Sequence, residues 1–264
     1  MSALQAVLTD LAAESDELDS VVSRLSPDQW GLVTTPEGWT IAHQIGHLHW
    51  TDRQSLLAIH DAGAFNAEIA EFINRADTIV DDEAAAMAEL GPAELLARWR
   101  TGRADLATAL ASVPAGEKVP WYGPPMSPIS MATARVMETW AHSHDVFEAL
   151  GLPKVPSDRV KNVCHLGIRT FAFAHQMRGE EVPEVQVRVE LTAPSGDRWE
   201  WGPEGAEQRV SGDAWDFALL ATRRRHRDDA NVTAQGDVAD HWLDIVQTFA
   251  GGAGNDPKRL DERG

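Results

Sequence analysis

Hydrophobic and polar residues follow a helical period over most of the first 150 residues. Leu and Val recur at spacings of three, four and seven, as at Leu4, Val7 and Leu8. This spacing is typical of an amphipathic helix with one buried face. Shorter helical pieces are predicted at 65–73 and from Asp81 onward. Four stretches have the length and pattern of long helices: residues 2–25, 40–62, 93–113 and 130–150.

The period changes to two after residue 184. Hydrophobic residues at 185, 187, 189 and 191 alternate with polar ones, which predicts a strand with one buried face. Pro194-Ser195-Gly196-Asp197 is a hairpin-turn signal that leads into Trp199 and Trp201. The remaining elements predicted for this half are strands at 208–211 and 232–235 and helices at 157–177, 212–220 and 237–249.

These patterns predict a two-domain α+β protein. Four long helices joined by short connections favour a helical bundle over residues 1–152. Strands and helices without regular βαβ alternation favour a small α+β domain over residues 153–253. The polar residues 254–264 are expected to form a flexible tail.

Composition narrows the classes of function. The formal net charge is −18 and the pI about 4.8, so nucleic acid and anionic membrane are not expected partners, and a small-molecule substrate is. No apolar run is long enough for a membrane span, and no export signal is expected at the N-terminus. Cys164 is the only cysteine, which excludes an internal disulfide and fits a cytoplasmic location. Only four of the 23 basic residues are lysines, a usage typical of high-GC, actinobacterial-like genomes.

Two of the predicted helices carry residues that can bind a metal. Glu138 and His142 are four residues apart, so they lie one turn apart on the same helix face. His43 and His47 have the same spacing on the helix that Thr40 caps. Three His or Glu ligands from facing helices would leave a coordination position open, as in a catalytic metal site. The alternatives are a solvated Glu–His pair, or buried histidines bonded to carboxylates.

The same residues carry a family resemblance. Gly38-Trp39-Thr40 followed by His47-Leu48, together with Glu138-Thr139-Trp140-Ala141-His142 and Asp145, resembles the helix signatures of DinB-like metal-binding bundles. The overall layout resembles the mycothiol-dependent maleylpyruvate isomerase family, in which such a bundle precedes a sterol-carrier-like domain. Weaker similarity to that second domain covers residues 212–252.

The resemblance implies a site and a chemistry. The ligands would be His47, Glu138 and His142, and the metal would be zinc. His43 does not match a ligand position of the family and is kept as a reserve ligand only because of its spacing. Asp145 would support the site without binding the metal. The family's thiol cofactor, mycothiol or a similar small thiol, adds to an unsaturated acid with help from an arginine of the second domain.

An arginine-rich run offers such a residue. Arg223-Arg224-Arg225-His226-Arg227 follows a predicted helix. One interpretation is that these cations stabilise the helix C-terminus and pair with Asp228 and Asp229. The other is that Arg224 holds the carboxylate of a substrate.

Three functions follow from these observations. The first is a metal-dependent enzyme that uses a small thiol in isomerisation, thiol addition or S-transfer on a small anionic metabolite. The second is a metal-dependent hydrolase that uses metal-bound water. The third is a non-catalytic metal-binding protein. Cys164 is expected to be a buried residue without a catalytic role.

Overall fold

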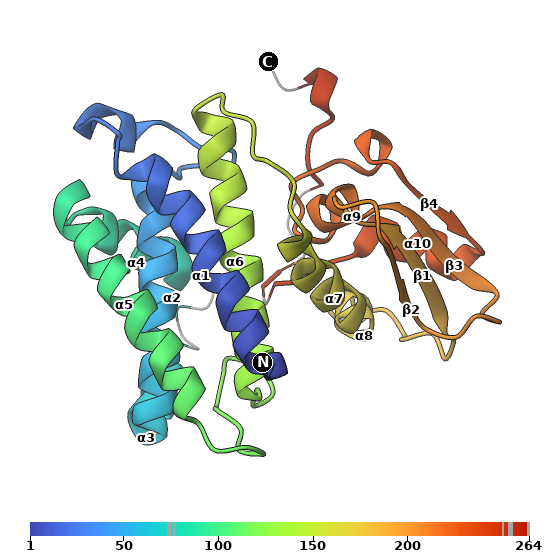
Figure 1. The fold of residues 1–264 in the computed structure, drawn as a ribbon, viewed down its shortest axis with the longest axis horizontal. Helices are drawn as coiled ribbons and strands as arrows, with labels where there is room; N and C mark the ends of the chain where they lie inside the picture. Colours follow the sequence, from blue (N-terminus) through green and yellow to red (C-terminus); the bar gives the residue numbers. More distant parts are fainter. Residues whose placement is uncertain (73–74, 76–77, 250, 253–255, 263–264) are drawn as a thin grey trace. The chain divides into compact units, whose positions relative to one another are not determined.

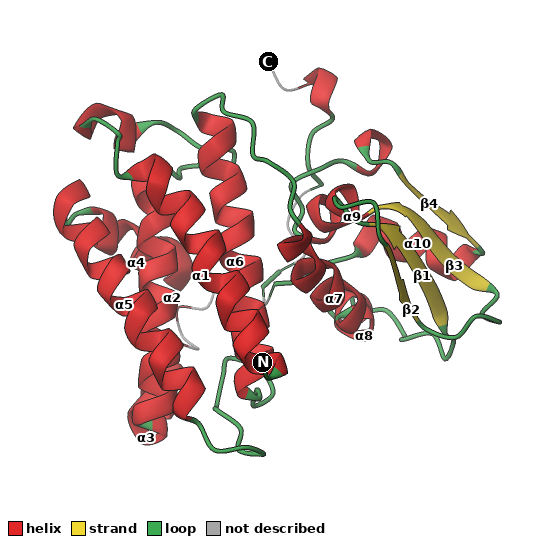
Figure 2. Ribbon diagram, viewed as in Figure 1, coloured by secondary structure: helices red, strands yellow, loops and turns green. Residues whose placement is uncertain are grey.

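The computed structural model describes residues 1–72, 75, 78–249, 251–252 and 256–262. The chain divides into two compact units, residues 1–154 and 155–264. The first unit is helical, and the second combines a four-stranded sheet with helices (Figures 1 and 2). The predicted order, a helical region followed by a small domain with a sheet, is therefore confirmed.

Four long helices lie side by side in the first unit (Figure 1). They are α1 (Ala3–Val22), α2 (Ile41–His60), α5 (Pro92–Ser112) and α6 (Pro128–Ala149). Two shorter helices, α3 (Ala62–Phe72) and α4 (Ile79–Ala88), connect α2 to α5. The predicted helical piece at 65–73 agrees with α3 as far as Phe72, whereas Ile73 lies outside the described residues. The next helix begins at Ile79, two residues before the predicted start.

Local signals explain where the long helices begin. Ser2 and Ser127 cap α1 and α6, and each side chain accepts a hydrogen bond from a backbone N–H three residues later. Pro92 and Pro128 occupy the first positions of α5 and α6, where a missing N–H costs nothing. Gly91 precedes α5 with φ +78°, a conformation that favours glycine.

Helix α2 is the centre of the first unit. It contacts α3, α4, α5 and α6, and its Ile41, Ile45 and Leu48 are fully buried. Gly46 allows α4 to come close, because a Cβ at this position would lie 2.7 Å from the carbonyl oxygen of Ala84. The sequence therefore brings the backbones of α2 and α4 nearly into contact at one residue.

The second unit is built on a mixed sheet. Its strands are β1 (Val187–Thr192), β2 (Arg198–Trp201), β3 (Gln208–Asp213) and β4 (Val232–Gln235), in the order β2-β1-β3-β4. β1 pairs in antiparallel fashion with β2 and in parallel with β3, and β4 is antiparallel to β3. Its α-helices are α7 (Lys161–Arg169), α8 (Phe171–Gln176), α9 (Ala214–Ala221) and α10 (Asp237–Ile245).

The predicted alternation explains the two faces of this sheet. Val189 and Leu191 are fully buried, and α9 and α10 pack against the sheet with Phe217 and Trp242. Glu190 points the other way and forms ion pairs with Arg188, Arg198 and Arg209.

Two predicted helices differ from the structure. The stretch 157–177 is interrupted at Thr170, which separates α7 from α8 and whose hydroxyl donates to the carbonyl of Gln247 at 2.6 Å. The last helix ends at Ile245 and not at 249, because the backbone turns extended at Val246 and the N–H of Thr248 donates to Ala221. Both differences come from hydrogen bonds to distant segments, which override the local helical pattern.

No helix among the described residues is both long and apolar enough to cross a lipid bilayer. Part of the predicted tail, residues 254–255 and 263–264, lies outside the described residues. Within the rest of the tail, Leu260–Glu262 forms a short 3-10 helix.

We expect Gly46→Ala to destabilise the protein by about 1–3 kcal/mol, because the added Cβ must displace the backbone of α4. This cost exceeds the gain of roughly 0.5–1 kcal/mol from replacing a helical glycine by alanine. Chemical denaturation of both proteins measures the difference.

Gly102→Ala is the matched control. Gly102 is also buried within a long helix, but a Cβ there would lie 3.5 Å from His49, an ordinary contact. This variant should be as stable as the parent or slightly more stable. Equal effects of the two substitutions would contradict the proposed close approach of α2 and α4.

Candidate metal centre

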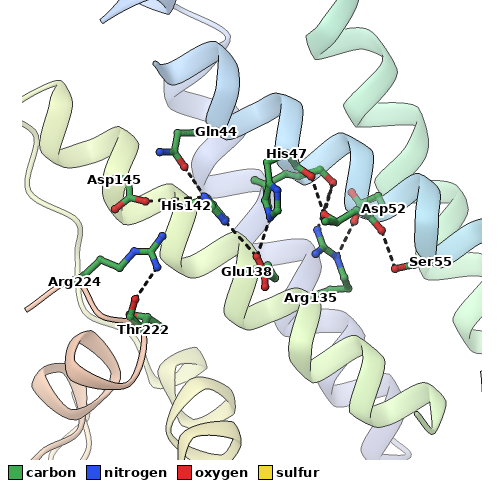
Figure 3. A network of polar contacts seen from close by, with 12 residues as sticks. Gln44, His47, Asp52, Ser55, Arg135, Glu138, His142, Asp145, Thr222 and Arg224 are labelled. Carbon is green, nitrogen blue, oxygen red and sulfur yellow. Dashed lines mark hydrogen bonds and ion pairs between the residues drawn. The ribbon is translucent and has the colours of Figure 1, made fainter. Parts of the chain in front are cut away.

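Two imidazoles and one carboxylate converge between α2 and α6 (Figure 3). His47 comes from α2, and Glu138 and His142 come from α6, one turn apart. The Nε2 atoms of both histidines lie 3.2 Å from Oε2 of Glu138, and the three potential ligand atoms lie within 4.8 Å of one another. The structure thus brings together the three residues that the family resemblance singled out.

The cluster is largely shielded from solvent. His47 and His142 are less than 10% exposed. Trp39 covers the cluster on one side, stacked on His142 with ring centroids 5.8 Å apart, and its indole N–H donates to Asp81. Trp50 approaches His47 at 6.0 Å between ring centroids. Buried polar groups of this kind need hydrogen-bond or metal partners to offset their lost hydration.

A chain of hydrogen bonds fixes the orientation of His142, and Figure 3 shows its last member, the contact between Gln44 and His142. The hydroxyl of Thr34 donates to the carbonyl of Trp39 at 3.0 Å, so its oxygen accepts from the amide nitrogen of Gln44 at 2.8 Å. The amide oxygen of Gln44 therefore faces His142, 2.5 Å from Nδ1. Because this oxygen can only accept, Nδ1 of His142 must carry the hydrogen.

This tautomer makes the cluster suitable for a cation. With its hydrogen on Nδ1, neutral His142 presents the Nε2 lone pair to the carboxylate of Glu138. Two lone pairs at 3.2 Å repel unless a proton or a metal ion lies between them. A tetrahedral zinc ion with bonds of 2.0–2.2 Å separates its ligand atoms by roughly 3.4 Å, close to the distance here. The donor set and the oriented imidazole therefore fit zinc.

The electrostatics of the cluster favour an ionised carboxylate. Burial alone would raise the pKa of Glu138, but when the imidazoles are protonated, hydrogen bonds and positive charge from His142 and His47 outweigh this effect and hold that pKa well below its ordinary value. Asp52 lies on α2 about one and a half turns after His47. Burial raises the pKa of Asp52, although the Arg135 guanidinium, 3.0 Å away, acts to lower it. This second buried pair also joins α2 to α6.

The remaining histidines of α2 have other roles. His43, the reserve ligand, is not part of the cluster: its Nδ1 lies 2.8 Å from the hydroxyl of Thr40 and caps the helix start. His49 points toward α5, next to Gly102. Burial, with the nearby Arg53 and Arg98 charges, lowers the pKa of His49 to about 4, so it is neutral at neutral pH.

Two residues close to the ligands on α6, His144 and Asp145, are at least partly buried. His144 is half-buried and stacks on Trp140. Asp145 is buried, with its carboxylate 4.0 Å from Nδ1 of His142, in agreement with a supporting position.

The arginine run belongs to the second unit. Arg223 pairs with Asp256, and Arg227 pairs with Asp240 and Asp244. Asp228 forms an ion pair with Arg259, and its carboxylate also lies 3.8 Å from Nδ1 of His226 in the run. Nη1 of Arg224 donates to the carbonyl of Thr222 at 2.7 Å.

Cys164 is fully buried in the second unit, and its thiol donates to the carbonyl of Ala214 at 3.2 Å. Burial raises the pKa of this thiol. Both observations agree with an inert core residue.

Sequence reasoning missed Gln44 and the Asp52–Arg135 pair. Gln44 lies three residues before His47, on the same helix face, where the period calls for an apolar residue. A polar side chain at such a position was the available signal. The Asp52–Arg135 pair joins residues 83 positions apart, and nothing in the sequence pairs them.

Comparisons with known proteins agree with this architecture. The family described as the mycothiol maleylpyruvate isomerase N-terminal domain matches residues 11–147. A second family, described as wyosine base formation, matches residues 183–235, which contain the four strands.

Among relatives in sequence are the uncharacterized proteins Rv0036c and MT0041 of Mycobacterium tuberculosis strains H37Rv and CDC 1551. Each is 47% identical over 247 residues, which is 94% of this chain and 96% of the relative. Among solved structures, a mycothiol-dependent maleylpyruvate isomerase matches with a TM-score of 0.60 at 19% identity, over 88% of this chain and 92% of that one. A mutant of that enzyme matches with a TM-score of 0.59 over the same shares. At this identity the likeness concerns the fold.

We expect Gln44→Leu to release the tautomer of His142, because leucine offers no acceptor to Nδ1–H. Nitrogen-15 NMR of histidine side chains in metal-free protein should give the Nδ1–H form of His142 in the parent and a mixture in the variant. The free energy of unfolding should fall by roughly 1–3 kcal/mol, the cost of a buried donor without an acceptor.

Gln54→Leu is the control, since Gln54 is buried on the same helix but bonds to Glu68. It should leave the His142 signals unchanged. An Nε2–H form of His142 in the parent protein would refute the orientation described above.

Proposed function

The chain belongs to the mycothiol maleylpyruvate isomerase N-terminal domain family, and on this premise we propose that it is a metal-dependent enzyme that uses a small thiol. The substrate would be a small anionic metabolite, and the reaction an isomerisation, a thiol addition or an S-transfer. Mycothiol or a related thiol would be the cofactor, and zinc the metal.

One observation carries the metal part of the proposal: the converging His47, Glu138 and His142 side chains with His142 held in a metal-binding tautomer. Three protein ligands leave room for a further ligand, which is typical of catalytic zinc and not of structural zinc. When bound, zinc would lower the pKa of a coordinated thiol or water molecule.

The protein's own residues would prepare this site. Gln44 holds the imidazole of His142, and Thr34 in turn holds Gln44. Trp39 keeps bulk water from one side of the cluster. A fixed and partly dehydrated set of donors strengthens electrostatic interactions with whatever binds there.

Two considerations support a thiol that comes from outside the chain. The only cysteine, Cys164, is fully buried with a raised thiol pKa, so the protein has no thiolate of its own to offer. A solved structure with a similar fold is that of a mycothiol-dependent enzyme. We therefore assign the thiol to a small molecule that binds from solution and not to a residue of the protein.

The finer fold assignments belong to the same proposal. The long helices would form a DinB-like four-helix bundle over residues 1–152, and residues 153–253 a sterol-carrier-like domain. These boundaries place the proposed metal ligands in the bundle and Arg224 in the second domain.

A metal-dependent hydrolase is the alternative, because the same three ligands can hold a water molecule. Turnover of candidate substrates with and without mycothiol separates the two. Dependence on thiol supports the proposal, and equal turnover without thiol supports a hydrolase. Tight zinc binding with no turnover in either assay would favour a non-catalytic metal-binding protein.

We further propose that Arg224 binds the carboxylate of the substrate. The net charge of −18 repels an acidic metabolite at long range, so a local cation is needed. The planar guanidinium of Arg224 can bind a carboxylate through two hydrogen bonds.

We expect His47→Ala, Glu138→Ala and His142→Ala each to lose bound zinc, because each removes one of three ligands. His144→Ala should keep the zinc of the parent protein, since His144 stacks on Trp140 and is not part of the cluster. Elemental analysis after dialysis against a weak chelator measures the content. Full retention of zinc in the first three variants would refute the site.

We expect Arg224→Lys to lower kcat/KM by roughly 10–150-fold, equivalent to about 1.5–3 kcal/mol for a charge-assisted hydrogen bond, with zinc content unchanged. An ammonium group keeps the charge but not the planar pair of donors. Arg223→Lys and Arg225→Lys are the matched controls. Unchanged turnover in Arg224→Lys and Arg224→Ala would refute this role.

A further inference from the structure

A second cluster with the same three residue types lies within the second unit. His175 at the end of α8, Glu180 in the following loop and His241 on α10 each offer one potential ligand atom, and these atoms lie within 4.8 Å of one another. His175 and Glu180 are five positions apart, but His241 lies 61 positions from Glu180, so only the fold brings His241 to the other two.

Both imidazoles are directed at one carboxylate oxygen. Nδ1 of His175 lies 3.0 Å and Nε2 of His241 lies 2.8 Å from Oε2 of Glu180. Their rings are 5.7 Å apart between centroids. Hydrogen bonds of this length become metal–ligand contacts after small side-chain movements, because zinc separates its ligands by roughly 3.4 Å.

One side of the cluster is packed in the protein interior, and the other side is open to solvent. His175 is 1% exposed and packs edge-on against Phe171, which in turn contacts Trp242 of α10. The side chain of His241 is 48% exposed, so a cation could enter from solvent. Nε2 of His175 has no hydrogen-bond partner among the described residues, and the same is true of Nδ1 of His47 in the first cluster.

The donor set selects the class of cation. Two imidazoles and one carboxylate suit zinc, cobalt, nickel or copper, whereas calcium and magnesium prefer oxygen ligands. Arg178 is close enough for its charge to interact with that of Glu180, and it offsets part of the negative field. Binding would therefore depend on the imidazole nitrogens more than on charge.

We propose that His175, Glu180 and His241 form a second binding site for a divalent transition metal, separate from the His47–Glu138–His142 cluster. The bound ion would link the C-terminal end of α8 to α10 and leave its remaining coordination positions to water. This inference does not depend on the proposed enzymatic function.

Zinc titration of the full-length, metal-free protein by calorimetry tests the site, with cobalt absorption as an independent readout. Glu180→Gln and His241→Ala should each remove one equivalent of bound metal or weaken that binding by at least about 100-fold, since losing even an outer partner of a ligand costs 10–100-fold. His142→Ala should keep this equivalent, whatever the first cluster binds.

Glu181→Gln and His165→Ala are the matched controls, because both residues are exposed and neither belongs to the cluster. Circular dichroism checks that the variants fold, and the exposed His241 makes loss of folding there unexpected. Unchanged stoichiometry and affinity in both Glu180→Gln and His241→Ala would overturn the proposal. The proposal would also be overturned if glycine, a weak zinc chelator, removed all of this bound metal.

Discussion

The contact between α2 and α6 must bury polar groups, and most of the first unit is arranged to make this possible. His47, Glu138 and His142 lie there, as does the Asp52–Arg135 pair. Dehydrating such groups is costly unless each finds a partner. Several of the partners come from the facing helix, which restricts how the two helices can be rotated relative to each other.

The surrounding structure restricts that rotation further. Gly46 brings α4 against the opposite face of α2, while Thr34 and Trp39, from the segment before α2, hold Gln44. Because a protein core is close-packed, a restraint on one side chain also restricts the positions of its neighbours. The imidazole of His142 is therefore held by a chain of contacts that begins outside the two helices, which is the kind of support that a preorganised metal site requires.

The negative net charge of the chain opposes the binding of the anionic substrate that we propose. A net charge of −18 favours solubility but repels anionic metabolites. In the second unit, two arginines, Arg223 and Arg227, form ion pairs with Asp240, Asp244 and Asp256. Under the proposed function, recognition of an acid would depend on arginines in defined positions and not on the general charge of the surface.

The sequence by itself determined the helices, the first strand and the pairing of Glu138 with His142, because each depends on a period of a few residues within one element. Only the tertiary structure decided between His43 and His47, since that choice depends on how α2 faces a helix 91 positions away. It also interrupted the predicted helix at Thr170 and brought His175 to His241. Such contacts join distant segments, and local periodicity carries no information about them.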